Sequence, residues 1–238
     1  FLNYCNHFPQ NLIFENNTTG LPLMRPLFFD DSESKYDTIS STYLWGNDFL
    51  ISPIMKADQA FQKVHFPSTS NWYDFYTKEF HQGGKEEFIK TQEDYIPTFV
   101  RAGAIIPMVD NILTTDNYKL DSLQLHYFYD FNVKGTSRSI YNDDGLLSNA
   151  YEKGYYELLQ INSKLSSNNI SMNLICELGN NQRSCNKNIE LFIYNFNKRP
   201  KKVILNGKEI HYNYNSSKTL KINFNWETAT ISELLIKF

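Results

Sequence analysis

The sequence predicts a mainly β protein, and three observations carry that prediction. The most apolar segment, Tyr95–Met108, has Pro97 and Pro107 near its ends. Proline suits the end or the edge of a strand because it cannot donate a ladder hydrogen bond. The chain holds 16 Tyr and 18 Phe but only 4 Met, which is typical of sheets. Residues 220–226 alternate between apolar and polar side chains, the period of a half-buried strand.

Composition excludes several classes of function. The 238 residues suffice for one or two domains with cores of their own. A net charge of −3 with dispersed basic residues predicts no nucleic-acid partner. No apolar run approaches the ~20 residues of a membrane span. No Cys or His pair has metal-ligand spacing, so we expect no metal and no cofactor. The chain starts at Phe1 without a signal peptide. We therefore expect a fragment or a processed product, and a periplasmic, secreted or secretory-pathway location stays open.

The first elements are predicted to be a helix and a strand. Residues 3–16 show a helical apolar period that stops at Gly20, and Pro9 predicts a kink or a late start. Residues 21–29 are predicted to be a buried strand that contains Arg25, followed by an acidic turn. A short helical segment is expected from about residue 36 to residue 45.

From Asp48 onward every periodic segment predicts a strand. Residues 72–76 and 86–90 flank a Gly83-Gly84 turn and are expected to form a hairpin. The apolar segment follows as a buried strand pair, broken at Gly103 by a bulge or a close backbone approach. Two earlier strands are predicted at residues 49–54 and 63–67, and a domain boundary in the polar stretch 110–121.

The second half predicts a β-sandwich of short strands separated by turns. Leu123, Leu125 and Tyr127 alternate with polar side chains, and Asn206-Gly207 is a hairpin signal. The Ser/Asn-rich stretch 162–169 is expected to be a loop. Strands are predicted at residues 138–142, 170–176, 189–196, 203–205, 220–226 and 231–238.

Four segments of the first half form an ordered set. They are Gly20-Leu-Pro-Leu-Met-Arg-Pro-Leu27, Tyr43-Leu-Trp-Gly-Asn-Asp-Phe-Leu-Ile-Ser-Pro53, Trp72-Tyr-Asp-Phe-Tyr-Thr77 with Gly83-Gly84, and Ile96-Pro-Thr-Phe-Val-Arg-Ala-Gly-Ala-Ile-Ile-Pro107. In sequence, order and spacing the set resembles glycoside hydrolase family 31, the α-glucosidase and α-xylosidase family. In that family these segments are the last barrel strand, the passage into the β-domains, a hairpin, and the close of the C-terminal β-domain.

A weaker similarity to the family runs from Leu123 to Glu157 and includes the turn Asp143-Asp-Gly145. The chain departs from the family at Gln10, where a tyrosine is usual, and at Ser41-Thr42, where an Asp-Gln pair is common. The first departure concerns the packing of the predicted helix.

The resemblance implies three regions. Residues 1–45 would be the last helix and strand of the (β/α)8 catalytic barrel, residues 46–121 a proximal β-domain, and residues 122–238 a distal β-sandwich. A barrel takes ~250 residues, so 1–45 cannot form one alone. The resemblance implies a retaining parent hydrolase of α-linked glycosides whose two catalytic aspartates lie upstream of Phe1. The chain would then be an inactive scaffold partnered by the N-terminal barrel portion. The alternative is a non-catalytic carbohydrate-binding module.

The carboxylates offer no catalytic pair. Hydrolysis of a glycoside needs two carboxylates across the scissile bond. Adjacent residues on a strand point to opposite faces, and those in turns point to solvent. This applies to Asp30-Asp31, Glu86-Glu87, Glu93-Asp94 and Asp143-Asp144. Asp30 and Asp31 alone follow a strand that the resemblance places in a barrel, so they could rim a substrate pocket. A plain turn is the alternative.

Other residues carry two interpretations each. Arg101 is expected to pair with a carboxylate or a carbonyl, with a substrate contact as the alternative. Trp72 and its aromatic neighbours form either core or a sugar platform, and the same holds for a second cluster at Tyr151, Tyr155 and Tyr156.

Cys176 and Cys185 flank a predicted hairpin loop. A disulfide between them would add about 2–3 kcal/mol, and two reduced thiols fit equally well. N-x-S/T sequons at Asn16, Asn17, Asn169 and Asn215 matter only in a secreted eukaryotic protein.

Overall fold

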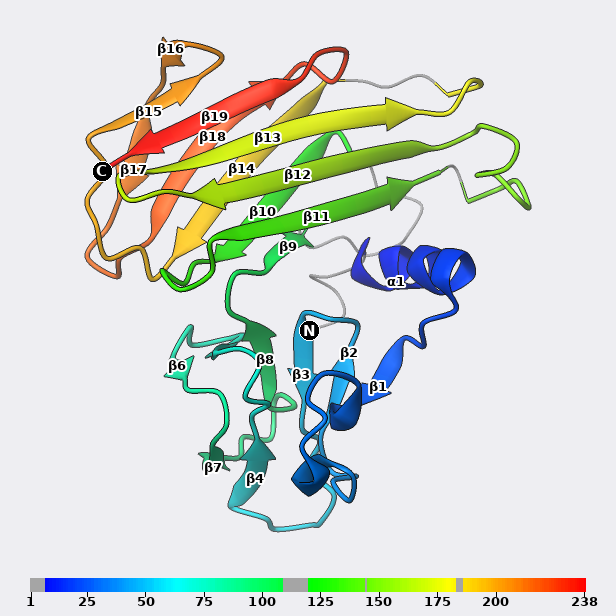
Figure 1. Cartoon of the computed structure of the whole chain (residues 1–238), viewed down its shortest axis with the longest axis vertical. Helices are drawn as coiled ribbons and strands as arrows, with labels where there is room; N and C mark the ends of the chain where they lie inside the picture. Colours follow the sequence, from blue (N-terminus) through cyan, green and yellow to red (C-terminus); the bar gives the residue numbers. More distant parts are fainter. Residues whose placement is uncertain (1–6, 109–119, 144, 183–185) are drawn as a thin grey trace. The chain divides into compact units, whose positions relative to one another are not determined.

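The structure, a computed structural model, describes residues 7–108, 120–143, 145–182 and 186–238 (Figure 1). The chain divides into two compact units. The first, called the small unit, is Glu15–Ala104, and the second, called the sandwich unit, combines Phe1–Phe14 with Ile105–Phe238. The predicted boundary stretch 110–121 lies mostly outside the described residues. The three-region division of the chain stays a prediction.

The helix α1 is described from His7 to Thr19, and residues 3–6 of the predicted helix 3–16 lie outside the described residues. Pro9 lies in its first turn, where the N–H that proline lacks would have no partner within the helix. Gly20 adopts a φ of +77°, and its N–H donates to the Asn16 carbonyl at 2.8 Å. The stop signal at Gly20 is therefore confirmed.

The small unit holds an antiparallel sheet of very short strands. Its order is β1-β2-β3-β8-β5-β6, and a separate pair, β4 with β7, completes the unit's described strands. Trp72, Phe99 and Phe66 are fully buried in its core. The strands are β1 (Met24–Pro26), β2 (Tyr43–Trp45), β3 (Phe49–Ile51), β4 (Phe61–His65), β5 (Trp72–Asp74), β6 (Phe80–His81), β7 (Glu86–Lys90) and β8 (Thr98–Arg101).

Two predictions about the start of this unit are wrong. The expected buried strand 21–29 is a strand only at β1. Pro26 then leads into a 3-10 turn, η1 (Leu27–Phe29), in which only Leu27 is buried and Phe28 and Phe29 are exposed. The expected helical segment at 36–45 consists of the end of a second 3-10 turn, η2 (Ser34–Tyr36), and the strand β2.

The predicted hairpin of 72–76 with 86–90 is also wrong. β5 pairs with β6 and β8, whereas β7 pairs with β4. The reversal occurs earlier than Gly83 because the Asp74 carboxylate accepts from the N–H groups of Tyr76 at 2.8 Å and Thr77 at 2.7 Å. Lys78 then adopts a φ of +66°, and the chain returns as β6.

The apolar segment is buried from Pro97 to Met108, except at the half-buried Arg101, but its two strands do not pair with each other. β8 belongs to the sheet of the small unit, and β9 (Ile105–Met108) joins a different sheet through β10. Gly103 adopts a φ of +86° between them, which confirms the break. β9 is an edge strand, and this explains how it tolerates Pro107.

The sandwich unit contains a five-stranded and a six-stranded sheet. Their orders are β17-β18-β14-β10-β9 and β11-β12-β13-β19-β15-β16, and β10 runs parallel to β14. The added strands are β10 (Ser122–Phe128), β11 (Gly135–Asn142), β12 (Glu157–Leu165), β13 (Asn169–Leu178), β14 (Lys187–Tyr194), β15 (Lys202–Leu205), β16 (Lys208–Glu209), β17 (Tyr212–Tyr214), β18 (Leu220–Trp226) and β19 (Ser232–Lys237).

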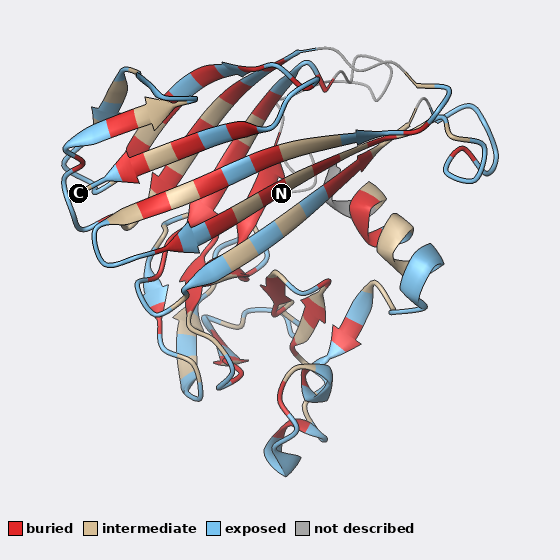
Figure 2. Ribbon diagram, turned by 45° about the horizontal axis from the view of Figure 1, so that its top comes forward, coloured by how far each residue is buried: buried red, intermediate tan, exposed pale blue. Residues whose placement is uncertain are grey.

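Figure 2 shows buried and exposed residues alternating along these strands. β18 confirms the predicted pattern, with Leu220, Ile222 and Trp226 fully buried. Asn206 and Gly207 have φ values of +49° and +81°, as their turn signal predicted. The predicted loop at 162–169 is wrong over residues 162–165, which continue β12 with alternating burial. Small polar residues there concealed a strand.

Candidate functional site

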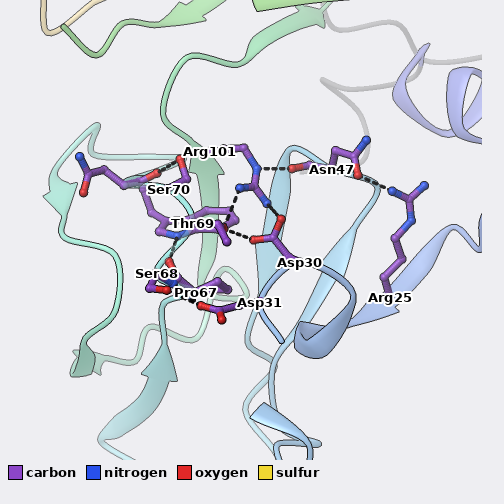
Figure 3. Close-up of polar contacts among 11 residues, drawn as sticks. Arg25, Asp30, Asp31, Asn47, Pro67, Ser68, Thr69, Ser70 and Arg101 are labelled. Carbon is purple, nitrogen blue, oxygen red and sulfur yellow. Dashed lines mark hydrogen bonds and ion pairs between the residues drawn. The ribbon is translucent and has the colours of Figure 1, made fainter. Parts of the chain in front are cut away.

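The carboxylate of Asp30 lies directly after η1 and faces Arg101 on β8 (Figure 3). The two side chains form an ion pair with 2.8 Å between Asp30 Oδ1 and Arg101 Nη2. Thr69 donates its hydroxyl hydrogen bond to the other oxygen of Asp30, and Arg101 Nη1 lies 3.4 Å from the Thr69 oxygen. The predicted pairing of Arg101 with a carboxylate is thus confirmed.

Asn47, in the turn between β2 and β3, links two arginines (Figure 3). Its backbone carbonyl accepts from Arg101 Nε at 2.6 Å, and its side-chain oxygen accepts from Arg25. Arg25 also donates to the Pro22 carbonyl at 2.7 Å and pairs with Glu15 at 3.1 Å. Arg25 is buried at 4% exposure. These partners explain how a cation can occupy the middle of β1.

Asp31 is buried and serves a different loop. Its Oδ2 accepts from the Ser68 N–H at 2.8 Å and from the Ser68 hydroxyl at 2.6 Å, and its Oδ1 accepts from the Glu33 N–H at 3.2 Å. Burial by itself raises the pKa of Asp31, but the hydrogen bonds from Ser68 and Glu33 outweigh it and hold the pKa below its ordinary value. Asp31 therefore stays ionised at neutral pH and cannot serve there as a general acid.

The loop 67–71 that receives both aspartates is itself tightly enclosed. The Trp72 indole donates to the Pro67 carbonyl at 3.3 Å, and the Arg101 guanidinium lies 4.6 Å from the centre of the Trp72 ring. A side-chain carbon added at Gly83 would lie 2.0 Å from the Ser70 carbonyl oxygen. Trp72 is fully buried, so its ring offers no exposed face to a sugar in this structure.

The chemistry that these contacts allow is positioning. Both aspartates are engaged by hydrogen bonds or an ion pair, and the pKa of Asp31 is lowered, the opposite of what a general acid needs. Asp30 keeps 20% of its side chain exposed, enough to contact a ligand at its rim. Glu86 and Glu87 point to different partners, Lys63 and His81, as expected for neighbours on a strand. In the described part of the chain no group of three His, Cys, Asp or Glu could hold a metal ion.

The second aromatic cluster lies in the sandwich unit. Tyr151 and Tyr155 are exposed by 41% and 37%, and the Tyr151 ring lies 5.0 Å from that of Phe14. The Cys176 sulfur lies 3.7 Å from Glu157 Oε1. Cys185 lies outside the described residues, so the disulfide stays a prediction. No helix among the described residues is long and apolar enough to cross a membrane.

Sequence analysis singled out Asp30, Asp31 and Arg101 but did not bring them together, and it missed Asn47, Ser68 and Thr69. The signal was incomplete. A cation in an apolar segment predicts that a polar partner lies nearby. Which residue that is follows only from the β3–β8 pairing, which places the turn at Asn47 beside Arg101. Ser68 and Thr69 look like ordinary loop residues along the chain.

Comparison with known proteins gives a consistent result. Residues 20–106 match the model of the glycosyl hydrolase family 31 C-terminal domain. The chain is 33% identical over 153 residues to an alpha-xylosidase of Saccharolobus solfataricus, covering 63% of this chain and 20% of that protein. It is 32% identical over 161 residues to alpha-glucosidase 2 of Bacillus thermoamyloliquefaciens, covering 67% of this chain and 20% of that protein. The chain thus spans about a fifth of the length of these relatives.

Among solved structures, a Flavobacterium johnsoniae family 31 dextranase superposes with a TM-score of 0.89 at 22% identity. The match covers 98% of this chain and 31% of the dextranase. The chain therefore shares its fold with about a third of the dextranase. Together these matches support the resemblance of the chain to the C-terminal portion of glycoside hydrolase family 31 enzymes.

Proposed function

We propose that the chain is the C-terminal scaffold part of a retaining glycoside hydrolase that acts on α-linked glycosides in the manner of an α-glucosidase. In this proposal the chain carries no catalytic aspartate and braces the N-terminal barrel portion of the same protein. The match of residues 20–106 to the family 31 C-terminal domain carries the proposal. The relatives' names, alpha-xylosidase and alpha-glucosidase, support the substrate class.

The exposed apolar side chains of the small unit support a partner. Met24 is 64% exposed, Phe28 44% and Phe29 51%, all within the segment that resembles the last barrel strand and its loop. Apolar side chains gathered in one short segment favour a covered surface over a solvated one. We assign residues 1–45 to the barrel, 46–121 to the proximal domain and 122–238 to the distal sandwich.

Within this proposal Asp30 and Asp31 hold the loop that follows the last barrel strand. Asp30 fastens the loop to β8 through Arg101, and Asp31 fastens it to the loop 67–71 through Ser68. Barrel active sites are built from such loops at the C-terminal ends of strands. The exposed edge of Asp30 would then rim the substrate pocket, with Trp72 behind Arg101 as support.

The inactivity of the chain by itself is tested with aryl α-glucosides and α-xylosides. The pure chain is expected to release no aryl alcohol above the rate of buffer alone. Turnover that survives rigorous purification would contradict the proposal, because it would require a catalytic pair inside this chain.

The bracing role is tested with the barrel portion supplied as a separate polypeptide. We expect the two to associate, and we expect Phe28→Asp with Phe29→Asp to abolish association because two charges would enter an apolar contact. Phe88→Asp is the matched control, since Phe88 is 72% exposed on β7, outside the barrel-like segment. Equal loss in both variants, or none in either, would contradict the assigned surface.

A free-standing carbohydrate-binding module is the second candidate. It is favoured by a polar hollow of about 420 Å³ on the sandwich. A stable monomer with measurable sugar affinity and no association with a barrel portion would favour this candidate over the first.

A further inference from the structure

The five-stranded sheet carries a hollow of about 420 Å³ on the face turned away from the sandwich core. This volume lies within the 300–1,000 Å³ typical of sites for small ligands. The hollow spans the three central strands β10, β14 and β18, which lie side by side (Figure 1). It is lined by Ser122, Gln124, Asn188, Ile189, Glu190, Asn223, Phe224 and Asn225.

Strand register places the polar members of this set in two adjacent rows. Ser122 pairs with Asn188, which pairs with Asn225. Gln124, Glu190 and Asn223 form the next row in the same way. Side chains two apart on a strand share a face, so both rows project from the same surface. Ile189 and Phe224 are buried and point to the opposite face, and they can offer only backbone atoms to the hollow.

A third row lies next to the two polar rows on the same face, outside the lining of the hollow. It consists of His126, Phe192 and Lys221 in register. The His126 and Phe192 rings stack with centroids 4.8 Å apart, and the Lys221 ammonium lies 5.0 Å from the Phe192 ring centre. Lys221 also pairs with Glu190 at 2.5 Å. The half-buried Phe192 ring therefore stands beside the polar rows.

The lining is rich in hydrogen-bonding groups and poor in net charge. Asn188, Asn223 and Asn225 are exposed, and each amide offers both donors and an acceptor. Glu190 is the ionised member of the lining, and Lys221 neutralises it. Such a surface offers little to phosphate groups or to a basic peptide. It suits a neutral ligand with several adjacent hydroxyl groups and an apolar ring face.

We propose that this face of the sandwich, called the amide face, binds a neutral oligosaccharide. Hydroxyl groups of the sugar exchange hydrogen bonds with Asn188, Asn223 and Glu190, and an apolar part of the sugar lies against the exposed part of the half-buried Phe192 side chain. That the sugar is α-linked rests on the proposed function. The site lies outside the catalytic barrel that the proposal requires, so it would hold a polymeric substrate rather than cleave it.

Isothermal titration calorimetry on the full chain tests the proposal with maltohexaose, isomaltohexaose and, as a β-linked comparison, cellohexaose. We expect an α-linked hexasaccharide to bind with a dissociation constant on the order of 1 mM, since few hydrogen bonds must offset the ordering of a flexible ligand. The double variant Asn188→Ala/Asn223→Ala should weaken binding about tenfold or more, because each lost hydrogen bond contributes modestly. Both residues are exposed, so the variant should retain the circular dichroism of the native fold.

Asn173→Ala is the matched control, an exposed asparagine on β13 of the other sheet, and its affinity should equal that of the native chain. No binding of any of the three sugars at millimolar concentration overturns the proposal. So does equal affinity of the double variant and the control. Binding of cellohexaose alone overturns the α-linked assignment. Aryl glycoside turnover by the chain would overturn the proposed function and leave this result unchanged, so the two failures are distinguishable.

Discussion

The two compact units bury a sheet by different means. The sandwich has long strands, such as β13 with 10 residues and β12 with 9, whose alternate side chains interdigitate in one large apolar core. In the small unit β1, β2, β3 and β5 have three residues each. Such short strands supply few ladder hydrogen bonds and little apolar face. Polar groups from loops, above all those of Asp30, Asp31 and Asn47, hold neighbouring segments of this unit together where strand pairing is short.

The difference teaches which substitutions each unit should tolerate. An apolar core is destabilised most when side-chain volume is removed from it. A network of polar loop contacts is destabilised most when the geometry of its hydrogen bonds is disturbed. The sandwich also contains a buried ion pair, between Lys187 and Glu157 at 2.9 Å.

The largest effect is expected in the sandwich core at Trp226, which is fully buried. Trp226→Ala should lower the free energy of unfolding by about 4 kcal/mol through lost burial and a cavity. Trp226→Phe should cost about 1 kcal/mol, because the indole N–H has no hydrogen-bond partner among the described residues. Urea unfolding followed by circular dichroism measures both. If Trp226→Phe lowered the free energy of unfolding as much as Trp226→Ala, the indole N–H would contribute to stability, contrary to this prediction.

Lys187→Met should destabilise the protein by about 3 kcal/mol, because Glu157 would remain buried and lose its cation. The double variant Lys187→Met/Glu157→Leu should recover most of that loss. A thermodynamic cycle of urea unfolding over the four proteins gives the coupling. If the loss of unfolding free energy in the double variant equals the sum of the losses in the two single variants, the two charges do not stabilise each other.

Gly83→Ala should cost about 2.5 kcal/mol, because the new carbon would meet the Ser70 carbonyl oxygen at 2.0 Å. Gly135→Ala in the sandwich is the control. Its new carbon meets the Ser163 carbonyl oxygen at 3.4 Å, and little change in thermal midpoint is expected. A small loss at Gly83 would show that the loop 67–71 can move aside.

Arg101→Ala should cost about 2 kcal/mol, since it removes the Asp30 pair, the Asn47 carbonyl contact and the cover over Trp72. Arg101→Lys keeps the charge but loses the planar fork, so it should recover less than half of the loss. Fluorine NMR of protein labelled with 5-fluorotryptophan can place the change, because the signals of Trp72 and Trp226 report different units. A shift confined to Trp226 would be the contrary result.

The smallest expected effect is the loss of stability at acid pH through protonation of Asp31. The folded-state pKa of Asp31 is lowered, so its contribution is fully present above the unfolded pKa of about 3.9 and is lost as the pH falls through the folded value. At pH 6 the native chain should be more stable than Asp31→Asn by about 1 kcal/mol, after allowance for solvent screening. The two should converge as the pH falls through the lowered folded-state pKa of Asp31. A gap in unfolding free energy that stays constant from pH 6 to acid would refute the assignment.

Local patterns predicted much of the sandwich. The alternation at 123–127 and 220–226 and the turn at Asn206-Gly207 depend on neighbours in the chain, and the structure confirms them. The predicted hairpin at Gly83-Gly84 was wrong because the chain already reverses at Lys78, so that β5 pairs with the nearer strand β6 and not with β7. The predicted loop at 162–169 was wrong over the end of β12, because Asn162 and Ser163 are residue types common in loops but lie here within a sheet.

The sequence alone determined the mainly β class and the resemblance to family 31. These depend on composition, motif order and the period of a strand. Only the tertiary structure decided that β8 and β9 enter different sheets, that Asp30 meets Arg101, and that Asn188 and Asn223 flank one hollow. Each of these joins residues far apart in the chain. Their partners are chosen by strand pairing and register, which no local pattern records.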